Sequence, residues 1–173
     1  MPKVVFVAGL KETGYGTIMD MVMEGSRKRL GSHIRVGFEE NELKKIGGMI
    51  TEDTKKAVAN LYKNIETRIA AALKRKSSVV VEGPLTLGTE DGYLPLLPKR
   101  FFESFKPEVF IVFESIDGKF TEIDLMQQEI NRAYAAMYAA LGNSVLKIIK
   151  VGKGGVKGAI RECTRIIEYF LAG

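Results

Sequence analysis

The stretch "KVVFVAGLKETGYGT", residues 3–17, decides the fold. It opens with a continuous β-branched apolar run, Lys3–Ala8, which is typical of a strand buried on both faces of a parallel sheet. A glycine-rich turn follows, and apolar residues at helical spacing predict a helix from about Thr17 to Leu30. Strand, glycine turn and helix in this order are typical of a loop that holds phosphate groups.

The turn keeps only part of the pattern that a working phosphate loop needs. The complete pattern is Gly-x4-Gly-Lys-Ser/Thr, in which backbone N–H groups cradle phosphates, the lysine neutralises them and the hydroxyl binds Mg²⁺. Gly9 and Gly14 keep the spacing, but Tyr15 and Gly16 occupy the lysine and hydroxyl positions, and Thr17 comes one place late. Glycines at a helix N-terminus still attract anions. The alternative is an ordinary strand-to-helix turn that needs glycine for tightness.

Strand and helix patterns alternate along the rest of the chain. Further strands are predicted at residues 33–38, 77–83, 108–114 and 144–151. Helices are predicted at residues 39–46, 51–76, 100–104 and 122–141, and after the glycine-rich residues 152–158 to about residue 171. Thr51 or Asp53 is the expected N-cap of the second of these, and residues 84–98 are expected to form a long loop. The alternation predicts one three-layer α/β domain with a five-stranded parallel sheet.

The helix predicted at 122–141 carries an apolar stripe, which helical spacing assigns to the core. The stripe comprises Met126, Ile130, Ala133, Met137 and Leu141.

Composition bounds the partners and the compartment. The chain has 173 residues, of which 46% are hydrophobic. Its formal net charge of +5 mildly favours anionic partners, and nucleic acid is not excluded as one of them. The single Cys163 suits a reducing, cytoplasmic compartment, and a metal site built on it and the single His33 is not expected. Apolar runs are too short for a membrane span, which needs about 18 residues, and the N-terminus has no signal-peptide pattern.

Two longer segments resemble the archaeal type of adenylate kinase. They are "VVVEGPLTLGTEDGYLPLLPKRFFESFKPEVFIVFE" (79–114) and "EINRAYAAMYAALGNSVLKIIK" (129–150), and weaker similarity covers most of the chain. The matching residues of the first are Glu82, Thr86, Thr89, Gly92, Tyr93, Leu94, Leu97, Pro98, Pro107, Glu108 and Glu114. The resemblance implies an adenylate-kinase-like fold of the P-loop class, ATP or ADP with Mg²⁺ as ligands, and a homo-oligomer, often a trimer.

The resemblance also suggests site residues. It places a metal-orienting carboxylate at Glu82 and a phosphate-binding cation at Arg132. It brings Gly152, Lys153 and Gly154 near an adenine. Structural alternatives to these functional roles stay open. Glu82 can cap the turn that follows its strand, and the glycines can serve a tight strand-to-helix turn. Lys11, inside the loop, is a candidate catalytic charge, and its alternative is a solvated lysine.

Departures from the family pattern predict reduced phosphoryl-transfer activity. Relatives carry an arginine-bearing lid between the fourth strand and the long helix, whereas "ESIDGKFTEIDL" (114–125) has no arginine, so a lid deletion is expected near 115–121. The acceptor-binding segment, about 38–53, is short and lacks arginine as well. Because phosphoryl transfer depends on charge stabilisation, the sequence favours a catalytically degenerate relative that keeps a nucleotide- or anion-binding cleft. The alternatives are an active kinase with a noncanonical loop, and a scaffold or RNA-associated protein.

Overall fold

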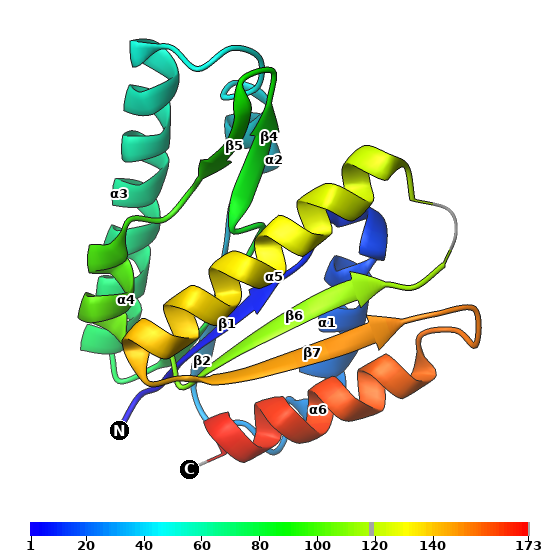
Figure 1. The fold of residues 1–173 in the computed structure, drawn as a ribbon. Coiled ribbons are helices and arrows are strands. Elements are labelled where there is room, and N and C mark those ends of the chain that lie inside the picture. The colour runs from blue at the N-terminus through cyan, green and yellow to red at the C-terminus, as the bar shows by residue number, and fades with distance from the viewer. Residues whose placement is uncertain (118–119, 173) are drawn as a thin grey trace.

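A five-stranded parallel sheet forms the centre of the molecule (Figure 1). The computed structural model describes residues 1–117 and 120–172. The strand order is β2-β3-β1-β6-β7, and every neighbouring pair is parallel. The strands are β1 (Val4–Ala8), β2 (His33–Gly37), β3 (Ser78–Glu82), β6 (Val109–Ser115) and β7 (Val145–Val151). The predicted three-layer α/β fold is therefore confirmed.

Helices cover both faces of this sheet. One face is covered by α1 (Tyr15–Ser26) and α6 (Lys157–Leu171), whose apolar residues share one buried cluster. The other face is covered by α3 (Glu52–Lys74), α4 (Lys99–Phe105) and α5 (Glu122–Gly142). Successive residues of β1 alternate between the two clusters, because side chains along a strand point to opposite faces. The predicted N-cap Thr51 is observed, and its hydroxyl accepts the N–H of Thr54 at 3.1 Å.

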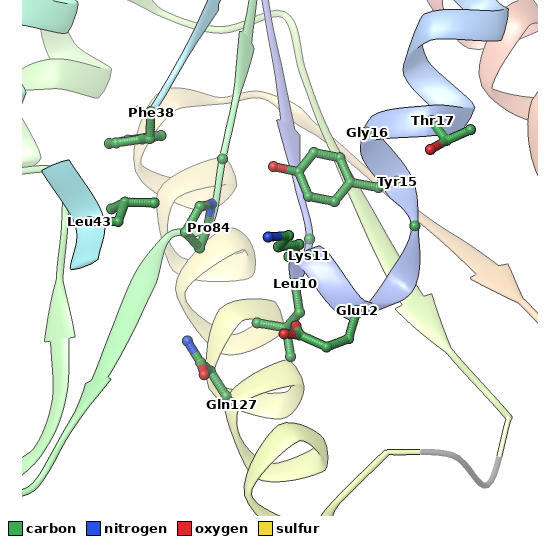
Figure 2. Close-up of a pocket in the computed structure, with 13 residues that line it drawn as sticks. Leu10, Lys11, Glu12, Tyr15, Gly16, Thr17, Phe38, Leu43, Pro84 and Gln127 are labelled. Atoms are coloured by element: carbon green, nitrogen blue, oxygen red, sulfur yellow. The ribbon is translucent and has the colours of Figure 1, made fainter. Parts of the chain in front are cut away.

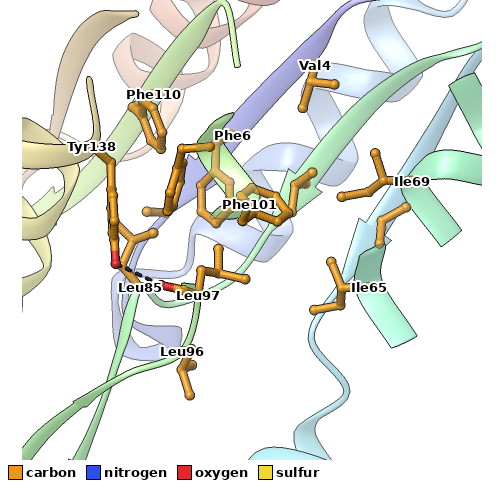
Figure 3. Packing of buried hydrophobic residues seen from close by; sticks show 14 of the residues in the cluster. Val4, Phe6, Ile65, Ile69, Leu85, Leu96, Leu97, Phe101, Phe110 and Tyr138 are labelled. Carbon is orange, nitrogen blue, oxygen red and sulfur yellow. Dashed lines mark hydrogen bonds between the residues drawn. The ribbon is translucent and has the colours of Figure 1, made fainter. Parts of the chain in front are cut away.

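Aromatic contacts lock α4 and α5 onto the sheet (Figure 3). Phe6 of β1 meets Phe101 edge-on, with ring centroids 6.1 Å apart. Phe102 stacks on Tyr138 at 3.7 Å, and the Tyr138 hydroxyl donates a hydrogen bond of 2.8 Å to the carbonyl of Leu97. Buried rings of this kind contribute large apolar areas, and the hydroxyl of Tyr138 finds a partner despite its burial.

The expectation of a long loop at residues 84–98 is wrong. The segment forms an antiparallel hairpin of β4 (Thr86–Thr89) and β5 (Gly92–Pro95). Contacts distant in sequence hold it: the Ile50 N–H donates to the Asp91 carboxylate at 2.7 Å, and the Glu90 N–H donates to the Gly48 carbonyl at 3.1 Å. The hairpin, α2 (Glu40–Lys44) and the turn that follows α2 together form one lobe beside α3 (Figure 1).

The assignment of the α5 stripe to the core is also wrong. Met126, Met137 and Leu141 are exposed by 51%, 45% and 54%. The buried face of α5 comprises Gln128, Asn131, Ala135, Tyr138 and Ala139. Polar residues face inward because they bond to strand ends, and the two alanines are small enough to let the helix approach the sheet closely.

Two glutamine and asparagine side chains illustrate this polar attachment. Gln128 accepts the Ser115 N–H at 2.7 Å and donates to the Ser115 carbonyl at 3.1 Å. Asn131 accepts the N–H groups of Leu85 and Thr86 at 2.9 and 3.0 Å. Both side chains satisfy buried backbone groups where strands end.

The connection between β6 and α5 runs from residue 116 to residue 121. The predicted lid deletion near 115–121 falls partly on residues 118 and 119, which lie outside the described residues, and it stays a prediction. Among the described residues, each helix is too short or too polar to cross a membrane.

Candidate functional site

The loop after β1 adopts a compact turn. Lys11–Thr13 form one turn of 3-10 helix (η1), and Gly14 follows with a φ of 73°, a left-handed conformation that favours glycine. The Thr13 hydroxyl donates to the Leu10 carbonyl at 2.6 Å and accepts the Tyr15 N–H at 3.3 Å. A donor at the start of α1 is therefore already used by the chain, which leaves fewer for a bound anion.

Tyr15 reaches from α1 back over the loop (Figure 2). Its ring stacks on Phe113, with centroids 6.3 Å apart, and a Cβ added to Gly9 would lie 2.9 Å from Tyr15 Cδ1. Burial, with a smaller effect from Glu82, raises the pKa of Tyr15 to about 12, although Arg35 opposes the shift. The residue at the lysine position is thus a neutral ring that closes over the first glycine of the loop.

A cavity of about 560 Å³ opens beside this loop. Its lining residues are Gly9, Leu10, Lys11, Glu12, Gly14, Tyr15, Gly16, Thr17, Phe38, Leu43, Gly83, Pro84 and Gln127. Among these described lining residues, Lys11 supplies the one cation and Glu12 the one carboxylate. The cavity therefore joins the predicted loop residues to the acceptor segment and α5, but its lining is nearly neutral.

Apolar and amide groups form the wall opposite the loop. The Phe38 ring lies directly over Gly83, where a Cβ would come within 1.9 Å of Phe38 Cδ2. Gln127 lies on the α5 side and donates to the Thr86 carbonyl at 3.1 Å. Figure 2 shows Phe38 and Tyr15 on two sides of the hollow, with Gln127 at its base.

Glu82 is engaged in an ion pair that the sequence did not reveal. Both of its carboxylate oxygens accept from Arg35 of β2, at 2.5 Å from Nε and 2.9 Å from a terminal nitrogen. The third donor group of Arg35 bonds to Asp20 of α1 at 2.6 Å. Each oxygen of this carboxylate already accepts one hydrogen bond from Arg35, which leaves Glu82 fewer acceptor sites for a metal-bound water, and its metal-orienting role stays a prediction.

Arg132 is committed to another carboxylate. Its Nε lies 2.6 Å from Oε1 of Glu114, whose side chain is 3% exposed, while the Arg132 side chain is 44% exposed. The N–H is not aimed at the oxygen, so the contact is a charge pair more than an aligned hydrogen bond. Arg132 is absent from the cavity lining, and its observed role is to neutralise a buried acid at the end of β6.

Gly152, Lys153 and Gly154 lie after β7, separated from the loop after β1 by strand β6. Gly152 forms a β-bridge with Gly155. The side chain of Ile116 packs against Gly152 so closely that a Cβ added to this glycine would lie 2.8 Å from Ile116 Cδ1. These residues do not line the cavity. Their contact with an adenine stays a prediction.

Comparison with known proteins places this geometry in a family context. Family models were searched without a match. The adenylate kinase of Methanothermobacter thermautotrophicus is 28% identical over 189 residues, covering 96% of this chain and all of the relative. The adenylate kinases of Thermoplasma acidophilum and Thermococcus onnurineus are each 23% identical, covering 93% and 97% of the chain and 96% of each relative. The chain is therefore similar to archaeal adenylate kinases over nearly its whole length.

A solved structure supports the same fold. Thymidylate kinase from Candida albicans superposes with a TM-score of 0.56, covering 97% of this chain and 92% of that one at 10% sequence identity. At this identity the likeness concerns the fold alone, which is that of a nucleotide kinase. The chain thus has the fold of a nucleotide kinase, while Glu82 and Arg132 are paired within the chain.

Proposed function

We propose that this adenylate kinase relative binds a nucleotide in the cavity beside residues 9–17 and has lost efficient phosphoryl transfer. The observation that carries the proposal is the pairing of its two candidate catalytic side chains besides Lys11. Glu82 is held by Arg35, and Arg132 is held by Glu114. Phosphoryl transfer needs several cations aimed at the phosphates, and the cavity lining offers Lys11 alone among the described residues.

The proposed ligand contacts follow from the lining. Gly16 and Thr17 lie in the first turn of α1, where the helix dipole and the N–H groups attract an anion. Without a lysine at this position, we expect that attraction to be weak. Phe38 and Tyr15 offer ring faces to a base, and Gln127 offers an amide. Within this proposal the chain is one domain with a reduced acceptor segment at 38–53 and no lid near 115–121.

A coupled assay of phosphate transfer between ATP and AMP tests the loss of activity. The Methanothermobacter thermautotrophicus enzyme, assayed in parallel, is the positive control. We expect turnover far below the range of about 1–100 per second that is ordinary for kinases. Turnover within that range would establish the alternative, an active kinase with a noncanonical loop. In that case replacing Lys11, Glu82 or Arg132 should abolish it.

Calorimetric titration tests binding separately from catalysis. ATP, ADP, AMP and GTP are titrated with and without Mg²⁺, and we expect weak binding that Mg²⁺ does not strengthen, because Glu82 is engaged by Arg35. Tyr15→Ala should open space over Gly9, whereas Tyr15→Phe keeps the ring and is the matched control. Absence of heat with all four nucleotides for all three proteins would overturn the nucleotide assignment.

We also infer that the protein self-associates, as the family resemblance suggests, through the outer face of α5. Met126, Met137 and Leu141 are exposed there at helical spacing, and Ile123 is 72% exposed at its start. Several large apolar side chains exposed on one helix face are typical of interaction sites. Light scattering at micromolar concentration should give an oligomer mass, and Met137→Glu should lower it. A monomer mass for the unaltered chain would contradict this inference.

A further inference from the structure

β7, at the edge of the sheet, and α6 lie side by side (Figure 1). Two cavities, of about 640 and 450 Å³, follow one another there and share Arg165 as a lining residue. We define the basic groove by the residues that line them: Val145, Lys147, Lys150, Gly155, Gly158, Ala159, Arg161, Glu162, Arg165, Ile166, Tyr169 and Phe170. The basic groove is separate from the cavity beside the loop, because strand β6 and β1 lie between them.

The charges of the basic groove are unbalanced. Its four cations are Lys147, Lys150, Arg161 and Arg165, all of them exposed, against the single carboxylate of Glu162. Within the described part of the chain, none of these cations forms an ion pair. Their positive potential is therefore available to an anionic partner.

The other end of the basic groove is apolar and aromatic. Tyr169 is 77% exposed, and its ring meets Phe170 edge-on at 5.0 Å. Arg161, Arg165 and Tyr169 follow one another at intervals of four residues, so their side chains line one ridge of α6. Two cations and then an exposed ring thus follow one another along one helix face, with the edge strand β7 beside them.

We propose that the basic groove binds single-stranded nucleic acid, with phosphates on the arginines and lysines and a base on Tyr169. Arginine binds phosphate through paired N–H groups, and stacking of a base on an aromatic ring accepts any sequence. A single strand fits better than a duplex, whose bases are covered by stacking. It fits better than an acidic peptide, which has no use for the exposed ring. The proposal does not depend on nucleotide binding in the cavity beside the loop.

Fluorescence anisotropy of the full chain with labelled rU12 and dT12 tests the proposal. With four cations on phosphates, the dissociation constant should rise about fiftyfold from about 50 mM to about 200 mM salt. Arg161→Glu/Arg165→Glu should weaken binding at least tenfold and lower the salt slope to about half. Tyr169→Ala should weaken binding about fivefold or more with the slope unchanged, because the ring carries no charge. The ratio of the rU12 and dT12 affinities tells whether RNA or DNA is preferred.

Lys63→Glu/Lys74→Glu is the matched control, because it makes the same charge change on α3, away from β7 (Figure 1). It should alter binding less than twofold, and thermal unfolding of every variant should show that the fold is kept. Equal losses in both double variants, or no binding at low salt, would overturn the proposal. It would also be overturned if a duplex or polyglutamate bound as tightly as the single strands and Tyr169→Ala had no effect.

Discussion

The cavity beside the loop and the basic groove differ in how arginines are used. Among the described residues no arginine lines the cavity, and Arg35 of β2 and Arg132 of α5 each lie against a carboxylate of the chain, Glu82 and Glu114 respectively. In the basic groove, Arg161 and Arg165 face one carboxylate among four cations. The number of cations near a site therefore says little about anion binding unless the carboxylates that neutralise them are counted too.

This difference has a structural cause. Glu82 and Glu114 end central strands, where their carboxylates are largely buried and must be compensated by a neighbouring cation. β7 is an edge strand, and its side chains are mostly exposed to water, so its lysines need no internal partner. Arg35 and Arg132 are expected to serve stability, and the arginines of the basic groove to serve binding.

Arg132→Ala should have the largest effect on stability. It leaves the Glu114 carboxylate, 3% exposed, without a compensating charge. We expect a loss of about 3 kcal/mol in the free energy of unfolding, measured by urea denaturation. Glu114→Gln/Arg132→Ala, which removes both charges, should recover most of that loss. A loss below about 0.5 kcal/mol, the level of an ordinary surface substitution, would show that the pair is not structural.

Arg35→Ala should follow, with a loss of about 2 kcal/mol, because it removes three charge-assisted hydrogen bonds but leaves Glu82 at a site that water reaches more easily. The matched control is Arg161→Ala in the basic groove, where we expect a change within about 0.5 kcal/mol. If Arg161→Ala destabilised the fold as much as Arg35→Ala, the contrast between the two regions would fail.

The sequence predicted the layers well because the three inner strands, β1, β3 and β6, are buried on both faces. A continuous apolar run such as Val4–Ala8, in a chain whose strand and helix patterns alternate, predicts a strand in the middle of a parallel sheet. The position of the glycine loop indicated the lining residues Gly9, Lys11, Gly14, Tyr15, Gly16 and Thr17. It did not indicate Gly83, Pro84 or Gln127, which come from other parts of the chain. The hairpin β4–β5 was missed because its strands are short, and contacts with residues 48–50 hold its tip.

Pairings between distant residues account for the other failures. Arg35 meets Glu82 because the parallel register sets Arg35 beside Val80 and Gly37 beside Glu82, which puts both side chains on the same face. No local pattern encodes that register. The orientation of α5 was mispredicted for a related reason: hydrophobic spacing favours Met126 and Met137 as core, but Gln128 is needed to bond the backbone of Ser115.

Gly9→Ala probes how tightly Tyr15 closes the loop. Its Cβ would lie 2.9 Å from Tyr15 Cδ1 and 3.3 Å from Phe113 Cβ, so we expect a loss of about 1–3 kcal/mol by overpacking. Tyr15→Ala should relieve that strain, so the Gly9→Ala/Tyr15→Ala variant should be destabilised by less than the sum of the single changes. Additive losses in urea denaturation would mean that the ring does not press on Gly9.

Tyr15→Phe should produce the smallest effect, and only at alkaline pH. The pKa of Tyr15 is about 12 in the folded chain against 10.0 ordinarily, with burial as the main cause. Between these values the folded state keeps a proton that the unfolded state has lost, so stability falls as pH rises. At pH 11 this loss is about 1 kcal/mol for Tyr15.

Because phenylalanine keeps the packing on Phe113 without a titratable group, Tyr15→Phe should lose less stability than the unaltered chain between pH 8 and 11. Tyr138, whose pKa is also raised to about 12, is present in both proteins and cancels in the difference. Parallel curves of unfolding free energy against pH would mean that the Tyr15 hydroxyl is open to water, and that the ring leaves room over the loop for an anion.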